Sequence, residues 1–206
     1  MSSENLATPS ISTSQGNRSK IPPRERILAA ARELFYTRGI RAVSVDAIAE
    51  AAATNKMTLY RHFESKDELV AEYLKGMAVE LEGLWLSVAK QHPGEPDGQL
   101  RAWIDLAAAM HSADDDRGCP FANAAVEIPE RDHPARAVIE STKAKYRAVL
   151  TDLCKRAGYR DYERLANEII LMFEGACIDR QSGSACGPSI RVFDMIRALV
   201  ANHPKV

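Results

Sequence analysis

The sequence has no long hydrophobic run, and only 6% of its 206 residues are aromatic. No apolar stretch approaches the roughly 18 residues that indicate a membrane span. The N-terminus also lacks the basic region and apolar core of a secretory signal. We therefore expect a cytoplasmic protein that has no membrane partner.

Cysteine is scarce as well, with four residues far apart in the chain. No C-x-x-C pair and no histidine at zinc spacing accompany them, so we expect neither a disulfide framework nor a metal site, and no cofactor. Buried or half-buried thiols are the ordinary use of such residues. A cysteine-based redox signal stays open as an alternative, through Cys119 after Gly118 or through a Cys177–Cys186 pair.

Catalytic motifs are missing too. The chain contains no Walker loop, no G-x-G-x-x-G, no G-x-S-x-G and no H-E-x-x-H. The segment SVAK at 87–90 matches the S-x-x-K spacing of serine acyl enzymes, but its partner motifs S-D-N and K-T-G are absent. We expect no catalytic residue and no enzyme, and a helical serine-type hydrolase is the remote alternative.

The composition is that of a globular protein, with 46% hydrophobic and 27% charged residues. The net charge of −1 conceals an uneven distribution, because residues 18–66 carry ten basic and five acidic side chains and residues 67–206 are net acidic. A basic end on an acidic body suggests that one end of the molecule meets a polyanion.

Helical spacing dominates the pattern after Pro22 and Pro23, so we expect an all-α protein. Residues 1–21 are rich in Ser, Thr and Asn without apolar periodicity, which predicts a disordered tail. A first helix follows and stops at Gly39. Its inward residues recur at the spacing of one helical face: Ile27, Ala31, Leu34 and Phe35.

Two short helices come next. Ser44 is suited to cap the first of them, which ends near residue 52, and Thr54 or Asn55 is suited to cap the second. The inward side of the second helix is Leu59, with help from Met57 or Phe63. Two short helices joined by about three residues form a helix-turn-helix, whose second helix enters the DNA major groove.

The polar side chains of that second helix match the chemistry of DNA. Lys56 and Arg61 can neutralise phosphates or grip guanine, and Thr58 and Tyr60 can donate hydrogen bonds to phosphates or base edges. Residues 65–68 read S-K-D-E, a capping box that starts a further helix. Its free amides together with Lys66 predict another phosphate contact.

The segment RERILAAARELFYTRGIRAVSVDAIAEAAATNKMTLYRHFESKDELVAEYL resembles the N-terminal domain of the TetR family of transcriptional regulators over about 50 residues. The order and spacing of its elements carry the resemblance, above all Thr58-Leu59-Tyr60 and Phe63 followed by Ser65-Lys66. The resemblance implies an all-α homodimer that binds a palindromic double-stranded DNA operator. It also implies release of the operator when a small-molecule effector enters the C-terminal domain, with repression as the usual role.

Carried over by position, the resemblance implies a DNA-binding domain at 22–67 and a ligand-binding and dimerisation domain at 68–206. The implied DNA contacts are Ser44, Lys56, Met57, Thr58, Tyr60, Arg61, His62 and Lys66. For His62, packing between helices is an equal alternative. Residues 51–53 are all alanine and depart from the family, in which a glycine often occupies this turn.

The C-terminal part reads as six further helices. A long helix of about 24 residues is expected to begin near Leu69 and to end at the cluster HPGEPDG, residues 92–98. The segment RGCPFANAAVE resembles a subset of the TetR family. The others are expected at about 99–111, within 119–130, from 133 to 158, at 161–181 and at 189–203.

The effector pocket is expected among the middle helices and suits a hydrophobic or amphipathic ligand, such as a drug, a lipid or an aromatic metabolite. Each candidate could instead belong to the plain core. The candidates are Trp85, Trp103, Leu106, Met110, Phe121, Asn123, Tyr146 and Phe173.

The last two helices resemble the pair that dimerises TetR-family proteins as a four-helix bundle. The chain's own core is the competing use of their apolar residues. The expected interface residues are Ile169, Met172, Phe173, Ala176, Phe193, Ile196 and Val200.

Overall fold

The computed structural model describes residues 21–111, 117–181 and 188–206. The regular structure of these residues is helical, so the predicted all-α class is confirmed. The elements are α2 (Pro23–Arg38), α3 (Val45–Ala51), α4 (Lys56–His62), α5 (Lys66–Gln91), α6 (Pro96–His111), α7 (Pro120–Glu127), α8 (Pro134–Arg156), α9 (Tyr162–Gln181), the 3-10 helix η1 (Pro188–Arg191) and α10 (Val192–Asn202).

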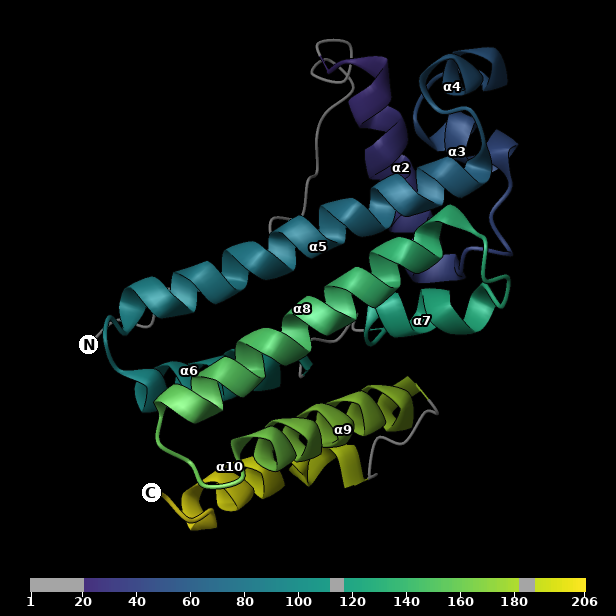
Figure 1. Cartoon of the computed structure of the whole chain (residues 1–206). Helices are drawn as coiled ribbons and strands as arrows, with labels where there is room; N and C mark the ends of the chain where they lie inside the picture. Colours follow the sequence, from purple (N-terminus) through teal and green to yellow (C-terminus); the bar gives the residue numbers. More distant parts are fainter. Residues whose placement is uncertain (1–20, 112–116, 182–187) are drawn as a thin grey trace, which may run out of the picture.

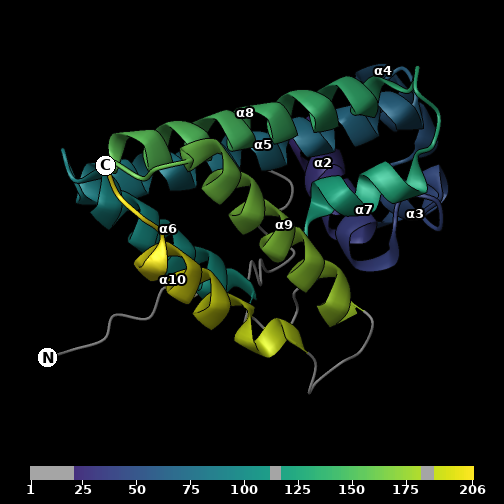
Figure 2. The same ribbon diagram turned by 60° about the horizontal axis from the view of Figure 1, so that its bottom comes forward.

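Two long helices, α5 and α8, lie side by side and form the axis of the molecule (Figure 1). Helices α2, α3 and α4 gather where α5 begins, and α7 lies beside them under the start of α8. Helices α6, α9 and α10 cover the remaining side of the axis (Figure 2). The DNA-binding candidate therefore lies at one end of this axis, and α6, α9 and α10 lie along its side.

The three N-terminal helices close around a small apolar core. Ile27 of α2, Ile48 of α3 and Leu59 of α4 are each 0% exposed. The short helices begin as predicted, because Ser44 Oγ accepts a hydrogen bond from the Ala47 amide at 3.1 Å, and Asn55 Oδ1 accepts one from the Thr58 amide at 2.9 Å. Of the two alternatives for the second cap, Asn55 is the residue used.

The turn between α3 and α4 is made without glycine. Ala53 adopts φ +48°, the left-handed conformation that residues with a Cβ enter at a cost. The Ala53 carbonyl accepts a hydrogen bond from the Arg26 guanidinium at 3.2 Å, and the Thr54 amide donates to the Ala49 carbonyl at 2.9 Å. The alanine that departs from the family pattern thus occupies the position where a glycine relieves backbone strain.

Helix α5 belongs to both halves of the molecule. Leu69, Val70 and Leu74 are fully buried in one cluster with Ile27 and Phe35 of α2. The same cluster includes Phe121 of α7 and Ile139 of α8, so packing is continuous across the predicted boundary at residue 67.

Smaller differences from the sequence prediction have local causes. Helix α6 starts at Pro96 instead of near Gln99, since a proline suits the first turn of a helix, where its missing N–H costs nothing. Residues 1–20, nearly all of the predicted tail, lie outside the described residues.

Replacing Ala53 with glycine should raise the free energy of unfolding by about 0.5–1 kcal/mol, because glycine adopts φ +48° without steric cost. For a chain of this size, the midpoint of thermal unfolding should rise by roughly 1–4 °C.

Ala29, exposed in the middle of α2, provides the matched control. Ala29→Gly should lower the free energy of unfolding by roughly 0.5–1 kcal/mol, because glycine weakens a helix interior. Equal destabilisation by both substitutions in differential scanning calorimetry would show that Ala53 is unstrained.

Candidate DNA-binding surface and ligand cavity

Helix α4 lies at the outer end of the molecule (Figure 1). Most of its side chains are exposed to solvent. Leu59 is the only buried residue within it, and Phe63, directly after the helix, is 1% exposed. Met57, the alternative inward residue, is instead 75% exposed. A seven-residue helix held by Leu59 and Phe63 leaves its remaining positions free to form a surface.

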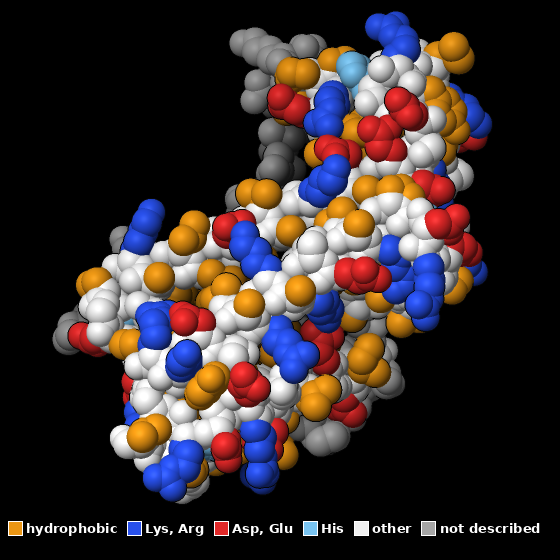
Figure 3. All heavy atoms as spheres, in the orientation of Figure 1, with side chains coloured by type: hydrophobic (Ala, Val, Ile, Leu, Met, Phe, Trp, Pro, Cys, Tyr) orange, Lys and Arg blue, Asp and Glu red, His pale blue; other side chains and the backbone are white. Residues whose placement is uncertain are grey.

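We call this surface the reading face, defined by Ser44, Lys56, Met57, Thr58, Tyr60, Arg61 and His62. Thr58 and His62 are half-buried and the other five are exposed. Lys56 Nζ approaches Asp46 of α3 at 3.4 Å, which links the start of α4 to the capped end of α3. Lys and Arg side chains project from this end of the molecule with hydrophobic ones between them (Figure 3).

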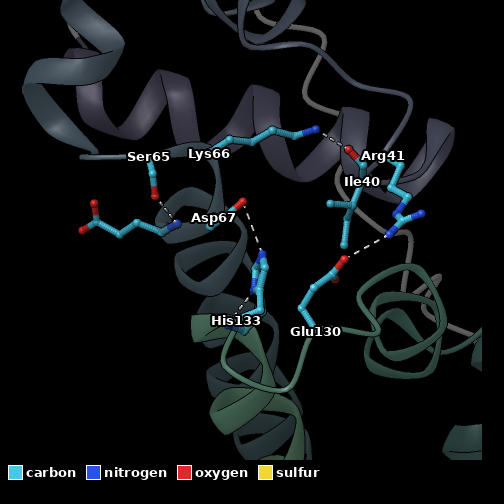
Figure 4. Close-up of polar contacts among 9 residues, drawn as sticks. Ile40, Arg41, Ser65, Lys66, Asp67, Glu130 and His133 are labelled. Atoms are coloured by element: carbon cyan, nitrogen blue, oxygen red, sulfur yellow. Dashed lines mark hydrogen bonds and ion pairs between the residues drawn. The ribbon is translucent and has the colours of Figure 1, made fainter.

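Lys66, the eighth predicted DNA contact, points into the molecule. Its ammonium donates to the Ile40 carbonyl at 2.6 Å and lies 5.9 Å from the centre of the Phe35 ring (Figure 4). Burial lowers the pKa of Lys66, opposed by the nearby carboxylates of Asp67 and Glu127. In this conformation Lys66 fastens the loop after α2 to the start of α5, and a phosphate would have to draw it away from Ile40.

The DNA-binding unit meets the C-terminal helices through a polar junction beside Lys66. Glu127 of α7 accepts a hydrogen bond from the Arg41 amide at 2.9 Å, and Glu130 lies 3.4 Å from the Arg41 guanidinium. His133, at the start of α8, lies 3.3 Å from Asp67 of α5 (Figure 4). Directional contacts therefore join three segments that also bury apolar side chains in the shared core, among them Ile40, Leu69 and Ile128.

Arg117 forms the second half of this junction. Its guanidinium donates to the carbonyls of Tyr36 and Thr37 at 3.1 and 2.6 Å, so it satisfies carbonyls in the last turn of α2. Its own carbonyl accepts hydrogen bonds at 2.8 Å from the amide groups of Asn123 and Gln181. Through Arg117, the end of α9 is connected to the end of α2.

A cavity of about 400 Å³ opens between α5 and α8. Trp85 and Tyr146, both predicted to bind the effector, line it. Other lining residues were not predicted, although they follow Trp85 and Tyr146 at helical spacing and could have been found from it: Leu81, Val88, Thr142, Val149 and Leu153.

Aromatic rings form the inner end of this wall. Trp85 stacks on Trp103 with ring centres 4.9 Å apart and planes 8° apart, and Tyr146 lies against both. Phe173 meets Trp103 edge-on at 6.1 Å. Four of the eight predicted ligand residues are therefore in one cluster, although Trp103 and Phe173 are behind the cavity.

The other four lie elsewhere. Phe121 packs in the core shared with the DNA-binding unit, and Asn123 serves the junction through Arg117. Met110 is 52% exposed, and Leu106 packs at the edge of the C-terminal core. Spacing along one helix does not reveal which neighbouring element a side chain contacts, so it could not separate these four residues from the cavity lining.

The predicted dimer residues fall mainly on the inner side of their helices. Five of them are buried in the chain's own core: Ile169, Ala176, Phe193, Ile196 and Val200. Met172 and Phe173 are half-buried. The exposed apolar residues of α9 and α10 are Leu171, Ile178 and Met195, at 71%, 50% and 54% exposure.

A shallow groove connects two of these residues. It runs between α9 and α10 and is lined by Leu171, Met172, Met195 and Leu199. We call these four residues the outer apolar face.

Neither alternative chemistry gains a suitable site. Burial raises the pKa of the Cys119 thiol, which disfavours the reactive thiolate, and Cys186 lies outside the described residues. Ser87 is exposed on α5, where its hydroxyl accepts a hydrogen bond from Gln91 at 3.3 Å.

In the described part of the chain, every helix is too short or too polar to span a lipid bilayer.

Comparison with known proteins identifies both halves of the chain. Residues 27–73 match the family model for bacterial regulatory proteins of the tetR family, and residues 96–182 match the C-terminal domain of LmrA/YxaF-like transcriptional regulators. The HTH-type transcriptional repressor SCO4008 of Streptomyces coelicolor is 30% identical over 136 residues, which are 62% of this chain and 67% of that protein. The repressor KstR2 of Rhodococcus jostii is 40% identical over 65 residues, 32% of each chain.

Solved structures agree with these matches. The TetR-family transcriptional regulator SCO4454 of Streptomyces coelicolor superposes with a TM-score of 0.78 at 26% identity, covering 87% of this chain and 92% of that one. A tetR-type regulator of Streptomyces avermitilis superposes with a TM-score of 0.68 at 30% identity, covering 86% and 99%. Two family models, a related repressor and these structures lead to one conclusion: the chain belongs to the TetR family of transcriptional regulators.

Proposed function

We propose that the protein is a homodimeric repressor that binds a palindromic operator and releases it when a small molecule enters the cavity between α5 and α8. The observation that carries the proposal is the reading face, a short helix anchored by Leu59 and Phe63 that presents a cluster of DNA-compatible side chains to solvent. Relatives named as repressors support repression as its role.

Each exposed residue of α4 has a use in the major groove. Lys56 and Arg61 supply positive charge for phosphates or guanine, and Tyr60 supplies a hydroxyl donor. Met57, 75% exposed, offers an apolar contact for a thymine methyl group. A side chain this apolar gains nothing from water, which supports a partner at this position.

Dimerisation would use the outer apolar face of α9 and α10. A second copy that packed on Leu171, Met172, Met195 and Leu199 would complete a four-helix bundle and remove these side chains from water. Two reading helices separated by about 34–36 Å would then fit successive major grooves of a palindrome.

Release of DNA would follow from a shift between two dimer forms. A ligand wedged between α5 and α8 favours the form that accommodates it, and α5 carries this change to the DNA-binding unit, with which it shares a core. Swinging the population from 1:99 to 99:1 requires roughly 5.5 kcal/mol of preference for one form. The Arg117 junction would transmit the change along a second path, from α9 to α2.

Selection of binding sites from randomised duplex DNA tests the DNA-binding role. The protein should recover one palindromic sequence, and Lys56→Ala/Tyr60→Ala should lose it. In salt titrations the slope of log affinity should become shallower by about 1 per phosphate contact removed. Lys90→Ala, at an exposed site on the opposite end of α5, should behave like the parent protein. Recovery of only unrelated sequences would contradict specific recognition.

Leu171→Asp/Met195→Asp should convert the dimer into a monomer in sedimentation equilibrium. A charge buried without a partner in the interface should weaken association by about 3 kcal/mol or more, at least roughly 100-fold. Val126→Asp serves as the control, because Val126 is equally apolar and 79% exposed but lies on α7. A dimer that survives the double substitution would place the interface elsewhere.

Arg117→Met should remove the charged donors that cap α2 while keeping an unbranched apolar stem. The free energy of unfolding should fall by about 1–3 kcal/mol, since two carbonyls lose a charged donor. Hydrogen exchange should accelerate in the last turn of α2 more than in α10. Arg131→Met, at an exposed loop residue, is the control and should leave both measurements unchanged. Equal effects of the two substitutions would show that Arg117 has no specific role in capping α2.

A further inference from the structure

The cavity between α5 and α8 is long and narrow. Its lining residues on α5 lie on one helical face from Ala78 to Ala89, and those on α8 lie on one face from Ser141 to Arg156. The two helices lie side by side and run in the same direction (Figure 1). At 1.5 Å per residue, these faces extend over about 16 Å of α5 and about 22 Å of α8.

This length determines the width of the cavity. A volume of about 400 Å³ spread over about 16–22 Å leaves a cross-section of roughly 20 Å². Such a cross-section fits a single extended hydrocarbon chain and is too small for a compact molecule of several fused rings. The shape of the cavity therefore favours a ligand that lies lengthwise between the two helices.

The middle of the cavity is apolar. The residues that line it there are Leu81, Val88, Val149 and Leu153. The two charged residues on this stretch belong to opposite helices and form an ion pair, Lys145 with Glu82 at 2.7 Å. Because the two charges compensate each other, this part of the cavity suits an uncharged, apolar part of a ligand.

Two further apolar residues of α5 line the cavity where it opens to solvent. Val79 is 69% exposed and Leu86 is 55% exposed. They are seven residues apart, close to two helical turns, so they lie along the same edge. A hydrocarbon chain that lay lengthwise would cover both side chains, and removal of apolar surface from water is favourable.

The two ends of the cavity differ in the polar groups that they offer. At the end nearer the DNA-binding unit, the hydroxyls of Ser141 and Thr142 donate to the Val138 carbonyl of their own helix at 3.1 and 2.7 Å. At the other end, Arg156 donates to Asp152 through Nε at 2.7 Å, and its two terminal nitrogens have no partner among the described residues. An arginine can bind a carboxylate with two parallel hydrogen bonds.

We infer that the ligand of this cavity is a single-chain amphiphile of the fatty-acid class, with its unbranched hydrocarbon chain lengthwise between α5 and α8 and its carboxylate at Arg156. This inference rests on the proposed function, in which the cavity is the effector site. Specificity then depends on the length of the chain, because the apolar walls contact every carbon along it.

A series of fatty acids from octanoate to hexadecanoate tests the inference by isothermal titration calorimetry with the full chain, below the critical micelle concentrations. Each added CH₂ group should tighten binding by about 4-fold. The increase should end when the chain fills the cavity, at about 12–16 carbons. Adamantane-1-carboxylate has the charge and the carbon count of undecanoate but is a compact cage, and it should bind roughly 10-fold more weakly or worse.

Ser141→Phe tests the direction of the chain. Ser141 is exposed and lines the end of the cavity that should hold the end of the chain, so a phenyl ring there should shorten the preferred fatty acid by about 2–4 carbons. Ala144→Phe is the matched control, because Ala144 is exposed on α8 but does not line the cavity. It should keep the preferred length.

Arg156→Gln tests the position of the carboxylate. It should weaken dodecanoate binding by roughly 5-fold or more and change dodecanol binding less, because the alcohol carries no charge. Lys155→Gln removes the same charge from the neighbouring exposed residue, which does not line the cavity. It should leave the affinities for both compounds as in the parent protein.

Four results would each overturn the inference: affinity independent of chain length, equal binding of undecanoate and adamantane-1-carboxylate, an unchanged preferred length in Ser141→Phe, or equal effects of Arg156→Gln and Lys155→Gln. Operator binding, measured in parallel by fluorescence anisotropy, separates this failure from that of the proposed function. A fatty acid that binds as expected but leaves the operator complex intact supports the assigned ligand class and contradicts induction through this cavity.

Discussion

Burial of the first turns of α5 against α2 is the contact on which the other features depend. Leu69 and Leu74 are 0% exposed in one core with Ile27 of α2. The ion pairs Arg24–Glu72 and Arg32–Glu80 flank this core, but exposed ion pairs contribute only about 0–1 kcal/mol each, so the apolar contact dominates. Because α5 continues unbroken to Gln91 and its later turns wall the cavity, the position of the reading face is tied to the cavity through one helix.

The junction on the other side of the DNA-binding unit has a different physical character. The contacts of Arg117, Glu127 and His133 are hydrogen bonds and ion pairs, which weaken steeply when their geometry changes. Apolar contacts tolerate small sliding motions, since they have no preferred direction. The core around α5 thus keeps the two halves together, whereas the polar junction selects their relative orientation.

The sequence predicted the fold and the reading face for the same reason. Helix caps such as Ser44 and Ser65 and helix stops such as Gly39 are local signals in the sequence. A short helix with one buried anchor residue must expose its remaining side chains. Most of the predicted dimer residues lie on the inner faces of α9 and α10, because both faces carry apolar residues and spacing alone cannot tell which face the chain itself covers. Arg117 acts through contacts with α2, more than 80 residues away, and Asn123 acts through the Arg117 carbonyl, and no local pattern contains such information.

The stacked pair of indoles has a consequence for spectroscopy. Trp85 and Trp103 are the two tryptophans of the whole sequence, and they lie in contact in the C-terminal part of the molecule. Light emitted by indole in this protein therefore originates from the neighbourhood of the cavity, while the three helices of the DNA-binding unit contribute none. Local unfolding of that unit would be invisible to tryptophan emission, and a denaturation curve followed in this way would describe the C-terminal half of the molecule only.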